Sequence, residues 1–301
     1  MSVKFRFERG SILRISTRIS TRISSAVFLA ATVTSIPYLH ASANARIKGE
    51  LGGLPALSDQ QRPKATIDIA KEIDALPPGK DKVGFADQAA NLVTAGDQGH
   101  DALQAVADAL SKALAETPIP AKGDQPPAPY MDLARLMRYE GVTVSLKDPL
   151  YLKANEILAA NEADISKADF TLKDLNHKTW TLSQLHGKIV LVNFWATTCD
   201  ACHKEMPALD AIYVHYQNEG LVVLCISAED AFTVNSFPLV RQFHPPVLVD
   251  SGGKVSKEFH VTGLPRTFVF NRDGKLVGMA IDQSTQEQFF ALLSAAGLKP
   301  E

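Results

Sequence analysis

The feature that most constrains the fold is an apolar run that leads directly into a pair of cysteines. Residues 188–196 read KIVLVNFWA, and TTCDACHKEMP follows at residues 197–207. A continuous apolar run of this length predicts a strand buried inside a sheet. We expect a helix from about Asp200 to Asn218 and then a second buried strand in GLVVLCIS, residues 220–227. Alternation of strand and helix predicts an α/β fold.

The sequence on either side of this segment completes the predicted sheet. Residues 170–188 alternate apolar and polar positions around Asn176 and His177, which predicts a hairpin. The remaining elements expected here are a helical segment near 230–242, the strand PVLVD, a short helix at Lys254 to His260, the strands RTFVF and KLVGMAI flanking NRDG, and a helix from Ser284 to Ala296. The closing antiparallel hairpin predicts a mixed central sheet flanked by helices.

The N-terminal half has a different pattern. Between Leu57 and Ala163, apolar residues at helical spacing predict five short amphipathic helices, interrupted by PPGKDK and IPAKGDQPPAP. The chain has 301 residues, of which 46% are hydrophobic, so it can bury the cores of two domains. We therefore predict an all-α domain of unknown role at 44–165 and an α/β domain at 166–301. The helices either pack only against themselves or offer a surface to a partner.

The first residues have the order of a signal peptide. A basic stretch is followed by the apolar residues 26–39 and then by ASANA. We predict a leader at 1–43 with cleavage after Ala43, or alternatively after Ala45, and export to the periplasm or another extracytoplasmic space. An uncleaved membrane anchor and a mitochondrial presequence are the alternatives. A formal net charge of −2 gives no sign of a phosphate-binding surface, so no nucleic-acid partner is expected.

The motif CDACH is compatible with several chemistries. Cys199, Cys202 and His203 satisfy the CxxCH pattern of covalent haem attachment, but here the motif directly follows a buried strand. Zinc would require further ligands, and the eight histidines are scattered. A structural disulfide across three residues restrains the unfolded chain little. Cys225, inside an apolar strand, is expected to be a core residue.

Redox exchange has a direct physical argument. If the helix begins at Cys199 or Asp200, unpaired backbone N–H groups and the helix dipole favour a thiolate on Cys199. Cys202, one turn further on, can break the mixed disulfide that an attack by Cys199 forms. We therefore predict that Cys199 is the nucleophile and Cys202 the resolving cysteine of a redox-active disulfide, with no metal and no cofactor.

At this point the residues resemble a known family. KIVLVNFWATTCDACHKEMPAL is similar to the dithiol segment of the ResA/TlpA branch of thioredoxin-like proteins, which are extracytoplasmic thiol-disulfide oxidoreductases. VTGLPRTFVFNRDGKLVG, further along the chain, resembles the second signature of the same branch. The resemblance covers about residues 168 to 300 and implies a thioredoxin fold there. It implies nothing about the helical half.

The resemblance also assigns residues. It implies that Pro265 is a cis-proline facing the dithiol and that the backbone of Leu264 pairs with a substrate strand. Glu205 matches an acidic residue that transfers protons for the sulfurs, although its position would also suit a solvated helical glutamate. Trp195 and Arg266 complete the predicted substrate-binding residues, and Trp195 also reads as a core residue beneath the site.

The predicted function is reduction of protein disulfides. The carboxylate of Asp200 would oppose a thiolate on Cys199, so a reductant is expected rather than a strong oxidant. The resemblance implies a membrane thiol electron donor of the CcdA/DsbD type and a role in cytochrome c maturation. The alternatives are a peroxiredoxin-like thiol peroxidase, although Ala196 stands where such sites have Thr, and a non-enzymatic helical binding protein with a redox-sensitive latch.

Overall fold

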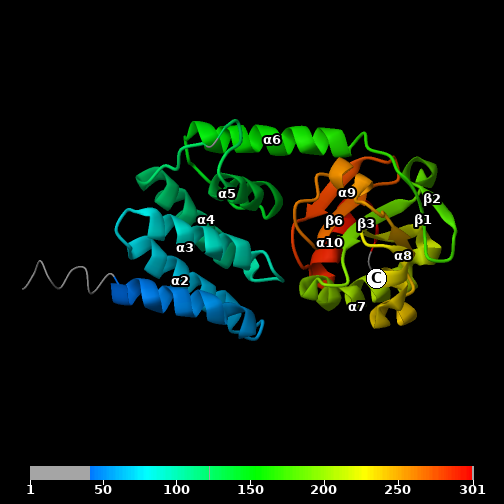
Figure 1. The fold of residues 1–301 in the computed structure, drawn as a ribbon, viewed down its shortest axis with the longest axis horizontal. Coiled ribbons are helices and arrows are strands. Elements are labelled where there is room, and N and C mark those ends of the chain that lie inside the picture. Colours follow the sequence, from blue (N-terminus) through cyan, green and yellow to red (C-terminus); the bar gives the residue numbers. More distant parts are fainter. Residues whose placement is uncertain (1–40, 122, 300–301) are drawn as a thin grey trace, which may run out of the picture. The chain divides into compact units, whose positions relative to one another are not determined.

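The computed structural model describes residues 41–121 and 123–299 (Figure 1). The chain from residue 45 onward forms one compact unit, within which we distinguish a helical region and a sheet region that meet near residue 166. The predicted leader lies outside the described residues except for 41–43. Residues 41–53 are helical and include both predicted cleavage positions. Within the described part of the chain, no helix combines the length and apolar character needed to cross a membrane.

The helical region contains the five helices predicted between Leu57 and Ala163. After a short 3-10 turn, η1 (Leu54–Ala56), they are α2 (Arg62–Ala75), α3 (Lys80–Val93), α4 (Gly99–Glu116), α5 (Ala128–Tyr139) and α6 (Pro149–Ile165). Helix α4 packs against α2, α3 and α5. Its apolar stripe explains this central position, because Val106, Leu110 and Leu114 are fully buried.

The sheet region has the mixed sheet that the sequence predicts. Its five strands are β3 (Ile189–Trp195), β4 (Leu221–Ser227), β5 (Val247–Val249), β6 (Arg266–Phe270) and β7 (Leu276–Ala280). They lie in the order β5-β4-β3-β6-β7. Strand β3 pairs parallel with β4 and antiparallel with β6. The predicted hairpin around Asn176 is also present, as β1 (Thr171–Lys173) paired with β2 (Thr179–Thr181).

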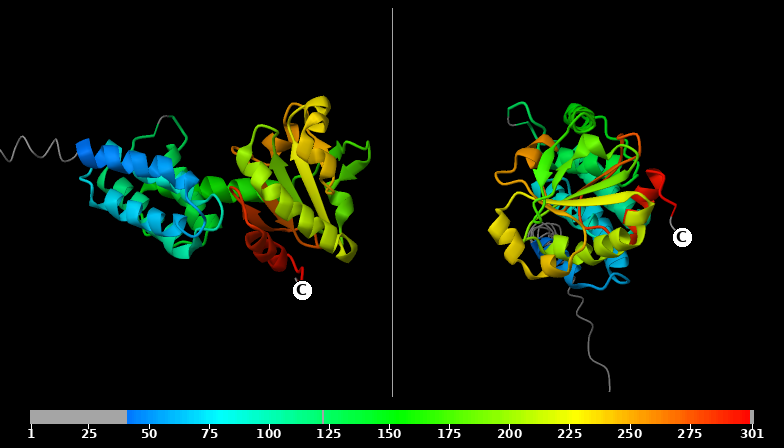
Figure 2. Two further views of the ribbon diagram at one scale, coloured as in Figure 1. Left: turned by 90° about the horizontal axis from the view of Figure 1, so that it is seen from below. Right: turned by 90° about the vertical axis from the view of Figure 1, so that its right-hand side faces the viewer.

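Helices cover both faces of this sheet (Figure 2). They are α7 (Asp200–Tyr216), α8 (Ala231–Ser236), α9 (Lys254–Glu258) and α10 (Gln286–Ala295), with the 3-10 turns η2 (Leu182–Leu185), η3 (Gln217–Glu219) and η4 (Pro238–Gln242). Successive side chains of β3 point to opposite faces. Leu191 and Trp195 join the core under α7 and α10, whereas Val190 and Phe194 pack around Phe259 on the α9 side. The thioredoxin fold predicted for this region is confirmed.

One predicted element is divided in two. The sequence predicts a single helical segment near 230–242, and the structure has α8 followed by η4. Phe237, between them, is extended, with φ −73° and ψ 125°. The next residue is Pro238, whose ring disfavours a helical conformation at the preceding residue and which has no N–H to continue the helix.

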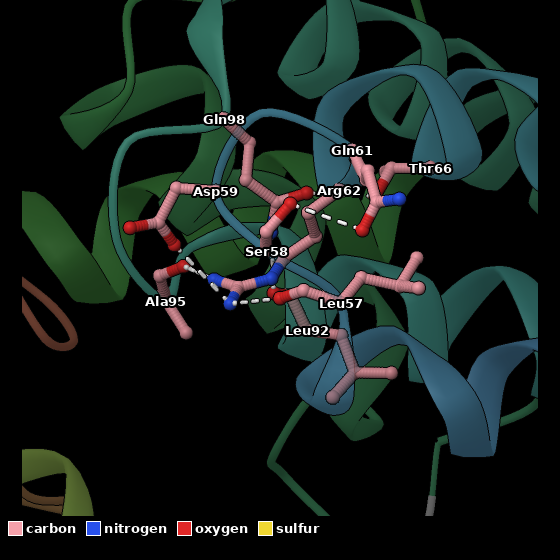
Figure 3. Close-up of polar contacts among 9 residues, drawn as sticks. All are labelled: Leu57, Ser58, Asp59, Gln61, Arg62, Thr66, Leu92, Ala95 and Gln98. Carbon is pink, nitrogen blue, oxygen red and sulfur yellow. Dashed lines mark hydrogen bonds and ion pairs between the residues drawn. The ribbon is translucent and has the colours of Figure 1, made fainter.

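A buried polar cluster fixes the loop between α3 and α4 (Figure 3). Gln98 donates from Nε2 to the carbonyl oxygen of Leu92 at 2.9 Å and accepts from the hydroxyl of Thr66 at 2.7 Å. The guanidinium of Arg62 donates to the carbonyl oxygen of Ala95 at 3.5 Å. Gln98 and Thr66 are 3% and 2% exposed, so water does not replace these bonds.

Replacing Gln98 with alanine is expected to destabilise the fold. The substitution leaves the Thr66 hydroxyl and the Leu92 carbonyl buried without this partner, which should lower the free energy of unfolding by about 1–3 kcal/mol. Urea unfolding followed by circular dichroism measures the change. Gln60→Ala is the matched control, since Gln60 is exposed and should change stability by less than about 0.5 kcal/mol. Equal effects of the two substitutions would contradict the structural role of Gln98.

Candidate active site

The two cysteines of CDACH form a disulfide at the start of α7. Cys199 is the N-cap residue, and its sulfur accepts a hydrogen bond from the backbone N–H of Cys202 at 3.1 Å. The helix begins at Asp200, as the sequence predicts. Cys199 is half-buried, whereas Cys202 is only 1% exposed. Cys199 is therefore the sulfur that a partner can reach first.

The side chain of Glu229 holds the turn that leads into Cys199. Its carboxylate accepts from the backbone N–H of Thr197 at 2.7 Å and from the Thr197 hydroxyl at 2.6 Å. The hydroxyl of Ser227 donates to the same carboxylate at 3.0 Å. Trp195 and Ser227, the last residues of β3 and β4, are paired in register, so the loops that follow both parallel strands meet at one edge of the sheet.

Glu205 is a buried carboxylate on α7, three residues after Cys202. It is 1% exposed. The side-chain amide of Asn193 donates to its Oε1 at 2.7 Å, and the backbone N–H of Ser284 donates to its Oε2 at 3.0 Å. Burial raises the pKa of Glu205 to about 8, and the two hydrogen bonds oppose this rise. Glu205 therefore can gain or lose a proton near neutral pH, which a solvated glutamate does not do.

Asn193 links this carboxylate to the strand that follows the predicted cis-proline. The same Asn193 amide donates to the Thr267 hydroxyl at 3.0 Å, and Thr267 is 1% exposed. The Leu264–Pro265 peptide bond, two residues before Thr267, is cis. Because Asn193 faces the α7 side of β3, one amide connects the central strand, helix α7 and strand β6.

The residues predicted to bind substrate differ in exposure. Leu264 is 41% exposed and so can meet a partner. Trp195 is 2% exposed, and its ring packs against Phe237 with centroids 5.9 Å apart. The Trp195 side chain lies beneath the surface, and its role in substrate binding stays a prediction. Arg266 is 8% exposed, so only a molecule that enters the protein can contact it.

The side chains of His203 and Asp200, on the first turn of α7, differ in exposure. The His203 side chain is 23% exposed, and its ring packs against Phe237 with centroids 4.7 Å apart. The Asp200 side chain is 99% exposed and lies 3.9 Å from the His203 ring nitrogen. Water therefore screens Asp200, and its opposition to a thiolate on Cys199 is at the weak, water-like end of the range.

A loop from the C-terminal part of the chain connects Glu205 to the helical region. The backbone N–H of Gly96 donates to the carbonyl oxygen of Gln283 at 2.9 Å, and the Thr94 hydroxyl donates to Asp282 at 3.1 Å. Ser284, the next residue, supplies a donor to Glu205. The polar cluster of Figure 3 fixes the 94–98 loop that makes these contacts. The helical region thus helps to hold the loop whose Ser284 N–H donates to Glu205.

The third cysteine is a core residue, as predicted. Cys225 is free and 2% exposed in β4, and burial raises the pKa of its thiol. The residues that the structure describes contain no group of three or more His, Cys, Asp or Glu side chains positioned to hold a metal ion.

Three residues of the site have no local sequence signal. Glu229 could have been found from the predicted sheet, because it follows a strand that runs parallel to the one leading to the cysteines. Ser284 and Asp282 contact residues that are 79 and 188 positions away, and no periodicity in the sequence indicates such pairs.

Glu205→Gln should flatten the dependence of stability on pH. Because the pKa is raised in the folded state from 4.5 to about 8, the folded chain binds more protons than the unfolded chain between these values. The free energy of unfolding therefore falls as pH rises through this window, by at most about 1.4 kcal/mol per pH unit. Urea unfolding at pH 5 to 8 should show a steeper slope in the parent than in the variant. Asp87 and Glu140, whose pKa values are also raised to about 7, contribute the slope that the variant retains. Glu258→Gln, at an exposed helical glutamate, should keep the full slope of the parent.

Asp282→Asn should lower the pKa of Glu205. The charge of Asp282 raises that pKa, although less than burial does, so the shift is modest and the group still titrates above 4.5. Carbon-13 NMR of the Glu205 carboxyl group over pH 5 to 10 measures the change. Asp273→Asn removes an exposed charge in the NRDG turn and should leave the titration in place. An unchanged titration in Asp282→Asn would contradict the described link.

Comparison with known proteins assigns the sheet region to a family. Residues 166–279 match the AhpC/TSA family. The thiol-disulfide oxidoreductase ResA of Bacillus cereus is 35% identical over 121 residues, which are 40% of this chain and 70% of that protein. The ResA protein of Bacillus subtilis (strain 168) is 32% identical over 140 residues, 45% of this chain and 78% of that protein.

Among solved structures, the exposed lipoprotein thioredoxin of Streptococcus pneumoniae is 27% identical and has a TM-score of 0.38, covering 44% of this chain and 100% of that one. The matches to ResA are long enough to show the family of this chain. They span most of the relatives' own length, and the chain carries a disulfide-forming cysteine pair at the start of a helix. The chain belongs to the ResA thiol-disulfide oxidoreductases.

Proposed function

We propose that this protein reduces disulfides in polypeptide substrates outside the cytoplasm, with Cys199 as nucleophile and Cys202 as resolving cysteine. The observation that carries the proposal is the unequal exposure of the two sulfurs at the start of α7, above a buried carboxylate with a raised pKa. An accessible sulfur can attack a partner, and an enclosed sulfur can complete the exchange without itself reacting with other molecules.

The reaction has two balanced steps. The Cys199 thiolate attacks one sulfur of the substrate disulfide, which forms a mixed disulfide and releases the other substrate sulfur as a thiolate. The Cys202 thiolate then attacks Cys199, which closes the Cys199–Cys202 disulfide and releases the second substrate thiolate. Two electrons pass from the dithiol to the substrate. The start of α7 supports the first step, since helix N-termini favour a thiolate.

Glu205 is the proton acceptor that this scheme needs. Cys202 must lose its thiol proton before it attacks, and water has little access to a sulfur that is 1% exposed. Glu205 is three residues further along the same helix, on a neighbouring part of its surface. With a pKa of about 8, its carboxyl group can take up that proton near neutral pH and return it later.

Several parts of the proposal come from the family rather than from contacts. Leu264, exposed beside the cis peptide bond, would align the substrate backbone. A membrane thiol donor of the CcdA/DsbD type would restore the dithiol, and apocytochromes c would receive the electrons. Extracytoplasmic location rests on the order of basic, apolar and small residues in 1–43.

A thiol peroxidase is the second candidate, because the AhpC/TSA family matches residues 166–279. In that reaction Cys199 would attack peroxide. Ala196 argues against it, since such sites place a threonine three residues before the reacting cysteine to hold the peroxide. Peroxide consumption with a thiol donor separates the two activities, and we expect none above the rate of the free donor.

Substitution of the cysteines tests the reductase proposal. Cys199→Ser should abolish reduction of insulin disulfides by a thiol donor, because the accessible sulfur is lost. Cys202→Ser should retain attack but accumulate a mixed disulfide on Cys199, which mass spectrometry detects. Cys225→Ala, at the buried third cysteine, should keep reductase activity.

Equilibration of the parent protein with glutathione gives the direction of electron flow. We expect a reduction potential nearer to about −270 mV than to about −120 mV. A reduction potential nearer to about −120 mV would contradict the proposed direction.

A further inference from the structure

A cavity of about 210 Å³ opens beside the segment that carries the cis peptide bond. Its walls come from helices α3 and α5, from residues 262–266 and from residues 281–282. We call it the arginine pocket and define it by Thr94, Asp132, Arg135, Leu264, Arg266 and Asp282. Leu264 is also the exposed residue proposed to align a substrate, so the pocket adjoins the expected path of the substrate chain.

Arg266 is an unsatisfied cation in the wall of this pocket. The residue is 8% exposed, and its Nε is buried without a hydrogen-bond partner. Among the described residues, no hydrogen bond or ion pair involves its guanidinium group. A buried charge without a partner costs several kcal/mol, so folded proteins normally supply one. The partner missing here is an acceptor, preferably an anionic one.

The other charged groups of the pocket do not fill this role. Asp132 pairs with Arg135 at 2.5 Å. Asp282 accepts from the Thr94 hydroxyl at 3.1 Å and from a backbone N–H at 2.7 Å. Burial and the charge of Arg135 lower the pKa of Arg266 to about 10, although the nearby charges of Asp282 and Asp132 oppose this fall, so the guanidinium is still protonated at neutral pH. Arg266 therefore keeps N–H donors without an acceptor in the protein, which indicates that a ligand supplies one.

The chemistry of the pocket selects among anions. A planar carboxylate matches the fork of a guanidinium group. Two aspartates in the walls would repel a phosphate dianion more strongly than a monoanion. Leu136 and Ile281 also line the pocket and would contact methylene groups. A short carboxylate on an aliphatic stem fits these walls, and the neighbouring Leu264 suggests that the stem belongs to a polypeptide.

We propose that the arginine pocket receives the carboxylate of an aspartate or glutamate close to the reacting cysteine of the substrate, and that Arg266 binds it. The inference rests on the proposed function and adds a substrate class to it: polypeptides with an acidic residue beside the disulfide. The helical region thereby contributes to substrate choice, because α3 and α5 form part of the pocket.

Paired peptides test the proposal. Each peptide carries one internal disulfide, with glutamate at one of the three positions on either side of its first cysteine, and each has a glutamine counterpart. The parent protein, with a thiol donor, should reduce the glutamate peptide with at least about tenfold higher kcat/KM at one of these positions, because a hydrogen bond to a charged group is worth that factor.

Variants show whether Arg266 causes the preference. Arg266→Gln should bring the glutamate-to-glutamine ratio to about one. Gly263→Phe is a second variant that leaves Arg266 in place, since a Cβ at Gly263 has no heavy atom within 4 Å and the ring can occupy the mouth of the pocket. It should also remove the preference. Arg241→Gln, at an exposed arginine on η4, should keep the parent ratio.

The possible results separate a failure of the pocket proposal from a failure of the reductase proposal. Reduction of all pairs at equal rates would overturn the pocket proposal and leave the reductase proposal standing. Reduction of no peptide would overturn both. Equal rates together with thermal stabilisation by acetate, lost in Arg266→Gln, would assign the pocket to a small free carboxylate and likewise overturn the proposed substrate class.

Discussion

The hydrogen bonds around one buried carboxylate connect the main parts of the structure. Glu205 on α7 accepts from Asn193 on the central strand and from Ser284 before α10, and Asn193 also reaches Thr267 on β6. An ionised carboxylate could not remain so enclosed without these donors, and a neutral one would need fewer of them. The site is therefore built to accept either protonation state, which is what a proton-transferring group requires.

The sequence predicted most elements because their signals are local. The apolar run at β3 and the helix that begins at the dithiol each lie within a window of fewer than twenty residues, and their predicted boundaries agree with the structure to within about two residues. The split of the segment after residue 230 was missed because a single proline outweighed the helical pattern. The position of Cys199 at the helix start followed from the same local pattern.

The surroundings of the cysteines were less accessible to prediction. The burial of Trp195 and Arg266 depends on segments far away in the chain, such as Phe237 for Trp195. The family resemblance identified Glu205, but its two donors lie 12 and 79 residues away. Local patterns specify which residues form a strand or helix, whereas the electrostatic environment of a side chain depends on the assembled fold.

The enclosure of Cys225 has a consequence for biogenesis. A chain with three cysteines can form three different intramolecular disulfides, and the structure has the one between Cys199 and Cys202. In the folded protein, Cys225 is 2% exposed within the core between the sheet and α7, and burial raises the pKa of its thiol. A non-native disulfide that involves Cys225 can therefore form only before the sheet has folded.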